Sequence, residues 1–208
     1  MANAFAFGLA VEPDAPDQLA LTIVEHDSES DTAPFVVRRT FTDPIETSVE
    51  DIAEGVQTRL AEAPYTARSS VVVHVGTEPG RALADAMSDR GVRPIRVRVR
   101  FDRDGTAVES DGETVIDARK EIVALSDAHR TGTLRVEHGS DEDAAHLARM
   151  LGHLVDDSNE GGEISTDGLD VQGISALLAY WWSTEQTADP TERLRADLPG
   201  TESSEPAL

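Results

Sequence analysis

Residues 69–101, SSVVVHVGTEPGRALADAMSDRGVRPIRVRVRF, indicate the fold class of this chain. Residues 69–77 are mainly β-branched and surround a histidine, a pattern that predicts a buried strand. A Glu-Pro-Gly turn then begins a helix that is expected to end at Gly91, because glycine favours the position after a helix. Residues 92–101 alternate between apolar and charged side chains and predict a second strand. A strand, a helix and a strand in this order are typical of a parallel pair in an α/β protein.

Three further strands are predicted before this stretch, at residues 4–12, 18–26 and 35–42. Short turn-like links join them, which favours an antiparallel meander. A helix capped by Thr47 or Ser48 then leads to the fourth strand. With right-handed crossovers, the fourth strand lies beside the first and the fifth lies outside the fourth. The prediction is an α/β fold with ribonuclease H-like topology, a mixed five-stranded sheet of order 3-2-1-4-5 flanked by helices.

The second half of the chain adds predicted helices at residues 117–130, 141–156 and 170–186. A polar excursion occupies 102–115, and residues 133–138 form a short extended segment. We expect one domain over 1–187. Residues 188–208, which contain Pro, Thr, Ser and Glu, are expected to form a disordered acidic tail.

The charge of the chain is strongly unbalanced, with 40 acidic and 18 basic residues among 208 and a formal net charge of −22. Lys120 is the only lysine, and the other basic residues are arginines. Because 39% of residues are hydrophobic and fall in periodic blocks, a folded protein is favoured over a disordered one. Such a surface suits the cytoplasm of an extreme halophile, since the Debye length is only about 3 Å at 1 M salt. An acidic protein from an ordinary organism is the alternative.

Several classes of protein are excluded by composition. The chain has no cysteine, which excludes disulfides, cysteine-bound zinc and a thiol nucleophile. No apolar run approaches the roughly 20 residues of a membrane span, so no membrane association is predicted. The phosphate-binding sequence G-x-x-x-x-G-K-[ST] does not occur, and no ATP chemistry is expected.

Beyond its topology, the segment from Val71 to Trp182 resembles the C-terminal nuclease domain of the large terminase subunit of tailed viruses. VVVHVGTEPGRALADAM matches a strand, a glycine-containing turn and a helix in that family. DARKEIVALSDAHRTGTLRV matches a helix that opens with a basic pair, and DGLDVQGISALLAYWW matches an alanine-rich last helix. The resemblance rests on the ordered series of these segments.

The resemblance implies two-metal nuclease chemistry, in which three or four carboxylates hold a pair of Mg²⁺ or Mn²⁺ ions. Taken position by position, the first acid is expected at Ala10, the second at His74 and the third at Asp170 or, in a shifted register, Asp167. Alanine binds no metal and histidine is a poor ligand for Mg²⁺, so two of the expected ligands are absent. Glu12 follows Ala10 by two residues on the same side of the strand, and it is a candidate displaced ligand together with Asp170.

The preferred hypothesis is a catalytically degenerate terminase nuclease-like domain of a haloarchaeal virus or provirus. It would bind or scaffold in viral DNA packaging or virion assembly, without a cofactor, in the cytoplasm or the virion. Its expected partners are packaging or virion proteins, with DNA as a further candidate. The alternative is an active Mg²⁺- or Mn²⁺-dependent DNA endonuclease that uses Glu12 and Asp170. A third hypothesis is a structural or regulatory interaction protein that retains only the fold.

Arginines alternate with apolar residues along the fifth predicted strand, so that Arg96, Arg98 and Arg100 share one face. Arg119 and Lys120 open the next helix, at a position that is also basic and near the cleft in the terminase family. These five residues are candidates for contact with nucleic acid or an acidic partner. The structural interpretation instead pairs the strand arginines with acidic side chains and assigns their charge to the protection of an edge strand.

Two other sets of residues yield weaker predictions. His146 and His153 lie two turns apart on one helix face, and we expect them at the surface. Tyr180 and Trp182 fall outside the apolar stripe of the last helix. They either form an exposed pair at a protein interface or pack against the helix at 141–156.

Overall fold

The structure of the protein is a computed structural model that describes residues 4–11, 18–30, 34–44, 48–101, 112–137, 141–156 and 169–187. Seven strands form one mixed sheet in the order β6-β5-β4-β1-β2-β3-β7. The strands are β1 (Ala4–Val11), β2 (Gln18–His26), β3 (Phe35–Pro44), β4 (Ser69–His74), β5 (Ile95–Arg100), β6 (Thr114–Asp117) and β7 (Leu134–Val136). The described helices are α1 (Val49–Ala61), α2 (Glu78–Asp89), α3 (Ala118–Thr131), α4 (Glu142–Asp156) and α5 (Val171–Thr187).

The predicted α/β class with a mixed sheet is confirmed, but the predicted five-stranded sheet is wrong in its extent. β6 pairs in parallel with β5, and β7 pairs in parallel with β3, so each edge carries one more strand. Between these additions the first five strands follow one another in the order β5-β4-β1-β2-β3. The added strands have four and three residues, which is too short for an alternating pattern to be recognised in the sequence.

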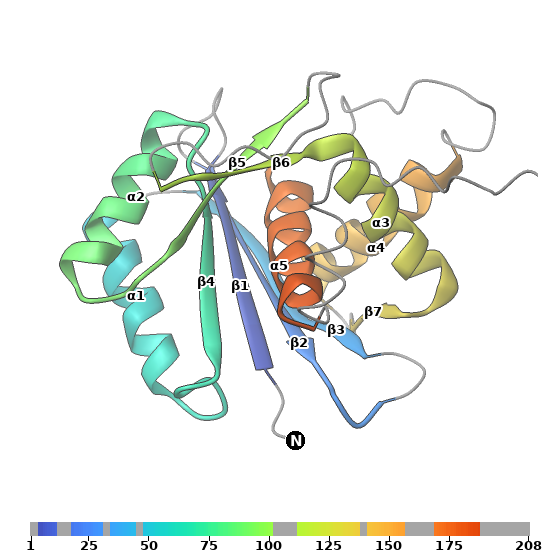
Figure 1. The fold of residues 1–208 in the computed structure, drawn as a ribbon, viewed down its shortest axis with the longest axis horizontal. Helices are drawn as coiled ribbons and strands as arrows, with labels where there is room; N and C mark the ends of the chain where they lie inside the picture. The colour runs from blue at the N-terminus through green and yellow to red at the C-terminus, as the bar shows by residue number, and fades with distance from the viewer. Residues whose placement is uncertain are drawn as a thin grey trace, which may run out of the picture.

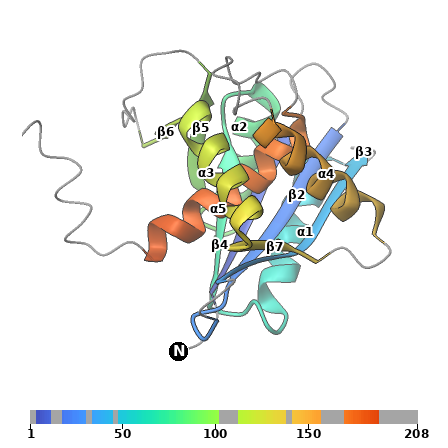
Figure 2. The same ribbon diagram turned by 90° about the vertical axis from the view of Figure 1, so that its right-hand side faces the viewer.

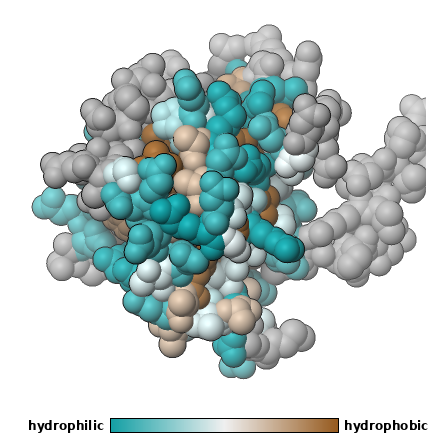
Figure 3. Space-filling view, turned by 90° about the vertical axis from the view of Figure 1, so that its left-hand side faces the viewer, coloured by the Kyte–Doolittle hydropathy of each residue, from teal (hydrophilic) through white to brown (hydrophobic). Residues whose placement is uncertain are grey.

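The sheet separates two layers of helices (Figures 1 and 2). α1 and α2 cover one face, while α3, α4 and α5 lie on the other. Side chains alternate between these layers along β1, because Phe7 and Leu9 belong to the α1–α2 core whereas Ala6 and Ala10 face the other layer. Figure 3 shows the side that α1 and α2 cover, where hydrophilic side chains predominate and smaller apolar areas lie between them.

α5 lies directly over the middle of the sheet, against β1 and β2. An added Cβ at Gly8 would lie 2.0 Å from the carbonyl oxygen of Ser175, so this close approach requires glycine. Thr22 is the cross-strand partner of Gly8, and its Oγ1 lies 2.7 Å from Oγ of Ser175 in a hydrogen bond. One turn of α5 is thus seated on a single cross-strand pair.

The outer side of α5 is covered by α3 and α4. Of the two alternatives for the pair, exposure at an interface is therefore wrong for Tyr180, which is buried and meets Phe35 edge-on at 5.4 Å between ring centroids. Trp182 is half-buried, and its ring lies 5.8 Å from that of Trp181. The buried side chains of α5 do not form a single apolar stripe, because the sheet lies on one side of this helix and α3 and α4 lie on the other.

Local signals set the helix limits. Ser48 is the N-cap of α1 and forms a capping box with Asp51. Gly91 and Gly132 both have φ of 79° and follow α2 and α3, as expected for glycine after a helix. The segment 102–111 of the predicted excursion and the predicted tail at 188–208 lie outside the described residues. None of the described helices has the length and apolar character needed to cross a membrane.

Candidate functional site

The carboxyl end of the sheet centre is where the resemblance places catalytic acids. β1 and β4 run in parallel, and Leu9 of β1 is paired with Val73 of β4. Ala10 and His74 follow this pair, so the two predicted positions are brought together at the same edge. Ala10 is 1% exposed and packs with Ala20 and with Val171 at the start of α5. The first ligand position is therefore filled by apolar side chains.

His74, at the second position, is a buried side chain. The backbone N–H of Val99 donates to its Nδ1 at 3.5 Å, and an added Cβ at Gly76 would lie 2.7 Å from its ring. Burial lowers the pKa of His74 below its usual value, and the Arg98 charge lowers it further, although a hydrogen bond with the Val97 backbone opposes the shift. A neutral, packed imidazole fits a structural role at the end of β4.

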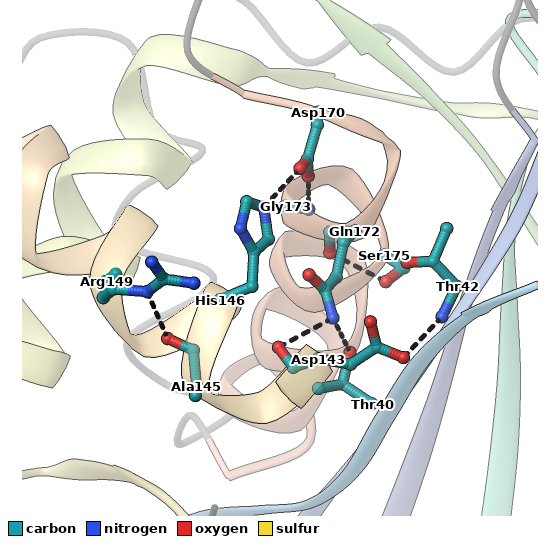
Figure 4. Close-up of polar contacts among 10 residues, drawn as sticks. All are labelled: Thr40, Thr42, Asp143, Ala145, His146, Arg149, Asp170, Gln172, Gly173 and Ser175. Atoms are coloured by element: carbon teal, nitrogen blue, oxygen red, sulfur yellow. Dashed lines mark hydrogen bonds and ion pairs between the residues drawn. The ribbon is translucent and has the colours of Figure 1, made fainter. Parts of the chain in front are cut away.

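Asp170, at the third position, stands immediately before α5 and joins two helices (Figure 4). Its Oδ1 accepts a hydrogen bond from the backbone N–H of Gly173 at 2.9 Å, which caps the first turn of α5. Its Oδ2 lies 2.8 Å from Nε2 of His146 on α4. The side chains of Asp170 and His146 are 44% and 49% exposed, so water reaches both.

The partnership of His146 with Asp170 was missed from sequence. His146 is surface-accessible as predicted, but it has a carboxylate partner 24 residues away. No local spacing connects the two residues, because the segment 157–168 separates their helices. The cap itself had a recognisable signal, since an aspartate immediately before a helical pattern favours the N-cap.

A buried polar network joins the start of α5 to the sheet (Figure 4). Nε2 of Gln172 donates to Oγ1 of Thr40 at 3.0 Å and to the backbone oxygen of Asp143 at 3.1 Å. Oγ1 of Thr40 lies 2.9 Å from Oγ1 of Thr22, which in turn contacts Ser175. Thr22, Thr40, Gln172 and Ser175 are each no more than 2% exposed. Thr22, within the otherwise apolar stretch Leu-Ala-Leu-Thr-Ile-Val of β2, was the available signal for this network.

The network continues to the surface through α4. The carboxylate of Asp143 accepts a hydrogen bond from the backbone N–H of Thr42 at 3.1 Å. α4 is thereby joined to β3 through Asp143 and to α5 through His146. The polar groups of this network hold α4 and α5 to the sheet, and its four buried side chains each have a hydrogen-bond partner.

The described residues at the predicted positions offer few oxygen donors. Among Ala10, His74 and Asp170, only Asp170 has carboxylate oxygens, and both of its oxygens are engaged. Within the described part of the chain, no three His, Asp or Glu side chains are grouped so that they could hold a metal ion. Glu12 and Asp167, the other candidate ligands, lie outside the described residues.

Two arginines of β5, Arg96 and Arg98, are paired with acidic side chains. Arg96 donates to Asp85 of α2 at 2.7 Å, and Arg98 donates to Glu113 at 2.6 Å. Arg100 is half-buried at the end of the strand. These pairs support the structural interpretation, except that β5 is not an edge strand because β6 pairs with it.

The basic pair Arg119 and Lys120 opens α3 as predicted, and Asp117 caps it through both backbone N–H groups. Since β6 runs parallel to β5, and β5 parallel to β4, this start of α3 lies at the same carboxyl edge as His74. The Lys120 side chain is 81% exposed. Burial raises the pKa of the neighbouring Glu121 above its usual value, against the opposing effect of the Lys120 charge.

The carboxyl end thus combines an apolar packing centre, a capped helix start and a histidine–aspartate pair. Comparison with known proteins finds no matching family model, no matching curated protein and no matching solved structure.

Proposed function

We propose that this chain is a catalytically inactive ribonuclease H-like domain, similar to terminase nuclease domains, that acts by binding. In this proposal it serves as a scaffolding component in viral DNA packaging or virion assembly, and its partner is a packaging or virion protein. The run β5-β4-β1-β2-β3 within the sheet supports the fold comparison. A fold by itself carries no function, so the proposal depends on the residues at its carboxyl edge.

The observation that carries the proposal is the packing of Ala10 under Val171. A two-metal nuclease needs open space and several oxygen ligands between the first strand and the last helix. At this place Ala10, Ala20 and Val171 are in contact and almost fully buried. Because this packing holds α5 on β1, a metal pair at this point would require the helix to move.

The proposal also accounts for Asp170. A carboxylate that accepts a backbone N–H at a helix start stabilises that helix without any metal. Its second oxygen joins α4 to α5 through His146. Asp170 is then retained for its structural contacts.

A protein partner is favoured over DNA by the state of the arginines. Arg96 and Arg98 are already paired with carboxylates of this chain, which reduces their capacity to bind phosphate. A net charge of −22 also repels nucleic acid. In the multimolar salt for which the acidic composition is suited, DNA binding would lose most of its counterion-release contribution.

A metal-binding titration separates the proposal from the active-nuclease alternative. The full chain is titrated with Mn²⁺ in multimolar KCl, which screens weak binding to surface acids, and bound Mn²⁺ is counted by electron paramagnetic resonance. We expect the unaltered protein to have no Mn²⁺ site that is lost in Asp170→Asn. A site with micromolar affinity that is lost in both Asp170→Asn and Glu12→Gln, but kept in Asp85→Asn, would establish the alternative.

The binding role is tested by reciprocal purification from cells in which the virus or provirus is active. The tagged chain is expected to recover a portal, capsid or packaging ATPase protein, and the tagged partner is expected to recover the chain. Recovery that persists after nuclease treatment supports a protein contact. Recovery that requires DNA, together with DNA binding that Lys120→Gln weakens, would replace the proposed protein partner by DNA.

A further inference from the structure

A cavity lies at the opposite end of the sheet from the predicted catalytic positions. It has a volume of about 230 Å³ and is formed by the amino ends of β1 and β4, the end of β2 and the last turns of α5. Ala6, His26, Arg68, Ser70 and Trp182 contribute to its wall. This volume is below the roughly 300–1,000 Å³ of pockets for drug-sized ligands, so a ligand of this cavity is compact.

The composition of the cavity wall differs from that of the chain. No acidic residue is among the described residues that line it, although 40 of the 208 residues are acidic. Arg68, an exposed residue, is among the residues that line it. Within the described ranges, no hydrogen bond or ion pair of the Arg68 side chain is found. Arg68 is therefore the one side chain with a full charge among the described residues that line the cavity.

Arg68 is placed at the cavity by its neighbours in the chain. Its backbone oxygen accepts a hydrogen bond from Phe5 N–H at 2.9 Å, and its own N–H donates to Tyr65 at 3.1 Å. Ala67 has φ of 59°, in the left-handed region that residues other than glycine seldom adopt. These contacts fix the backbone from which the guanidinium extends.

The rest of the cavity wall offers apolar surface that can contact the body of a ligand, together with a few polar groups. Trp182 offers an indole ring, and Ala6 and Phe5 offer apolar surface. Ser70 supplies a hydroxyl group. Burial lowers the pKa of His26, which is a wall residue, so its imidazole is neutral at pH 7 and adds hydrogen-bonding capacity without charge.

We propose that this cavity binds a small organic anion, with its carboxylate or phosphate group paired to Arg68 and its planar or apolar body against Trp182. The planar guanidinium fork matches both kinds of head group, which it can bind through two parallel hydrogen bonds. This site is independent of the proposed scaffolding role and of the carboxyl end of the sheet.

Calorimetric titration of the full chain with matched compounds tests the site, with tryptophan fluorescence as a second readout. Benzoate and phenyl phosphate share a ring and differ in the head group, so they distinguish a carboxylate from a phosphate ligand. Benzamide keeps the ring without charge, and inorganic phosphate keeps the charge without a ring. We expect one of the two aryl anions to saturate a single site per chain, more tightly than benzamide and inorganic phosphate.

Arg68→Gln is expected to weaken the binding of that anion by at least about tenfold, the effect of losing one charged hydrogen-bonding partner. Arg130→Gln, which alters another exposed arginine far along the chain on α3, is the matched control and is expected to bind like the unaltered protein. Both variants are first compared by thermal unfolding, because Arg68 is exposed and its replacement should leave the fold intact.

Three results would overturn the proposal. One is the absence of saturable binding for both aryl anions at millimolar concentration. Another is equal affinity of the unaltered protein and Arg68→Gln, or an equal loss in Arg68→Gln and Arg130→Gln, which would indicate only general charge attraction. The third is an inorganic phosphate affinity equal to that of phenyl phosphate, which would remove the role of the apolar wall.

Discussion

The two ends of the paired strands β1 and β4 are built in opposite ways. At the carboxyl end, Ala10 is buried under Val171 and the polar groups of α5 are bonded to the sheet. At the amino end, a cavity of about 230 Å³ separates the strands from the last turns of α5 and carries Arg68. The same helix closes one end and leaves the other open. The carboxyl end, where the resemblance expects catalytic residues, is filled by packed side chains, while a cavity lies at the amino end.

The closest contact between α5 and the sheet gives the largest expected effect. Gly8→Ala would place a Cβ 2.0 Å from the Ser175 oxygen and force the helix away from β1. We expect the free energy of unfolding to fall by about 3 kcal/mol or more, measured by denaturant titration. In Gly55→Ala, an exposed site of α1 with nothing near the added Cβ, stability should rise slightly. Equal behaviour of the two variants would show that α5 is not seated on Gly8.

The buried network should come next in size. Gln172→Leu removes the donor that Thr40 and the Asp143 backbone share, and buried groups without partners are costly. We expect a loss of about 1–3 kcal/mol in the free energy of unfolding. Gln57→Leu, which removes an exposed hydrogen bond from Gln57 to the Arg90 backbone, is the control and should cost much less. Similar losses would mean that the network adds nothing beyond an ordinary surface contact.

His74 should make stability depend on pH. Because burial lowers its pKa in the folded protein, the unfolded chain binds a proton more readily, and stability is lost as the pH falls below the ordinary value of 6.5. One such group contributes at most about 1.4 kcal/mol per pH unit. The free energies of unfolding of the unaltered protein and His74→Gln are compared between about pH 7.5 and about pH 5.5, which is roughly one unit on either side of the ordinary pKa of histidine.

The difference between the two proteins isolates His74. The pKa of His26 is lowered too and that of Glu121 is raised, but both groups are present in both proteins. Their effects therefore cancel in the comparison. We expect the two stability curves to converge as the pH falls, and parallel curves over the whole range would rule out a neutral, buried His74.

The smallest expected effect belongs to Asp170. Asp170→Asn keeps an oxygen for the Gly173 N–H and should cost only a few tenths of a kcal/mol, whereas Asp170→Ala should cost about 1 kcal/mol as a lost helix cap. Thermal unfolding of the two variants gives the comparison. A stability increase in both variants would point instead to a carboxylate held in an unfavourable position for function.

The sequence predicts the local elements of this molecule better than its long-range contacts. The helix start at Ser48 and the turn at Gly91 follow from a cap and a glycine, which act within a few residues. The approach of the start of α5 to Ala10 was implied only through the family resemblance, which expected a ligand at Asp170. The contact between His146 and Asp170 depends on how α4 and α5 pack, and no period in the sequence encodes it.

The edge strands and the cavity illustrate the same limit. β6 and β7 join the sheet through backbone hydrogen bonds over a few residues, so side-chain patterns say little about them. The cavity is formed by segments from four parts of the chain. No motif or residue pattern around Arg68 in the sequence indicates that it lies at a cavity. The acidic composition can be read directly from the sequence, but it identifies no site. The residues that pack around Ala10 and the described residues that line the cavity include no acidic side chain.

A DNA cleavage assay tests whether the carboxyl end is a packed structural region without nuclease chemistry. The full chain is incubated with supercoiled and single-stranded DNA in multimolar KCl with Mg²⁺ or Mn²⁺, beside Asp170→Asn and the control Asp85→Asn. We expect the DNA to remain intact to the same extent with all three proteins. Metal-dependent cleavage by the unaltered protein and Asp85→Asn that Asp170→Asn abolishes would show that nuclease chemistry is present there.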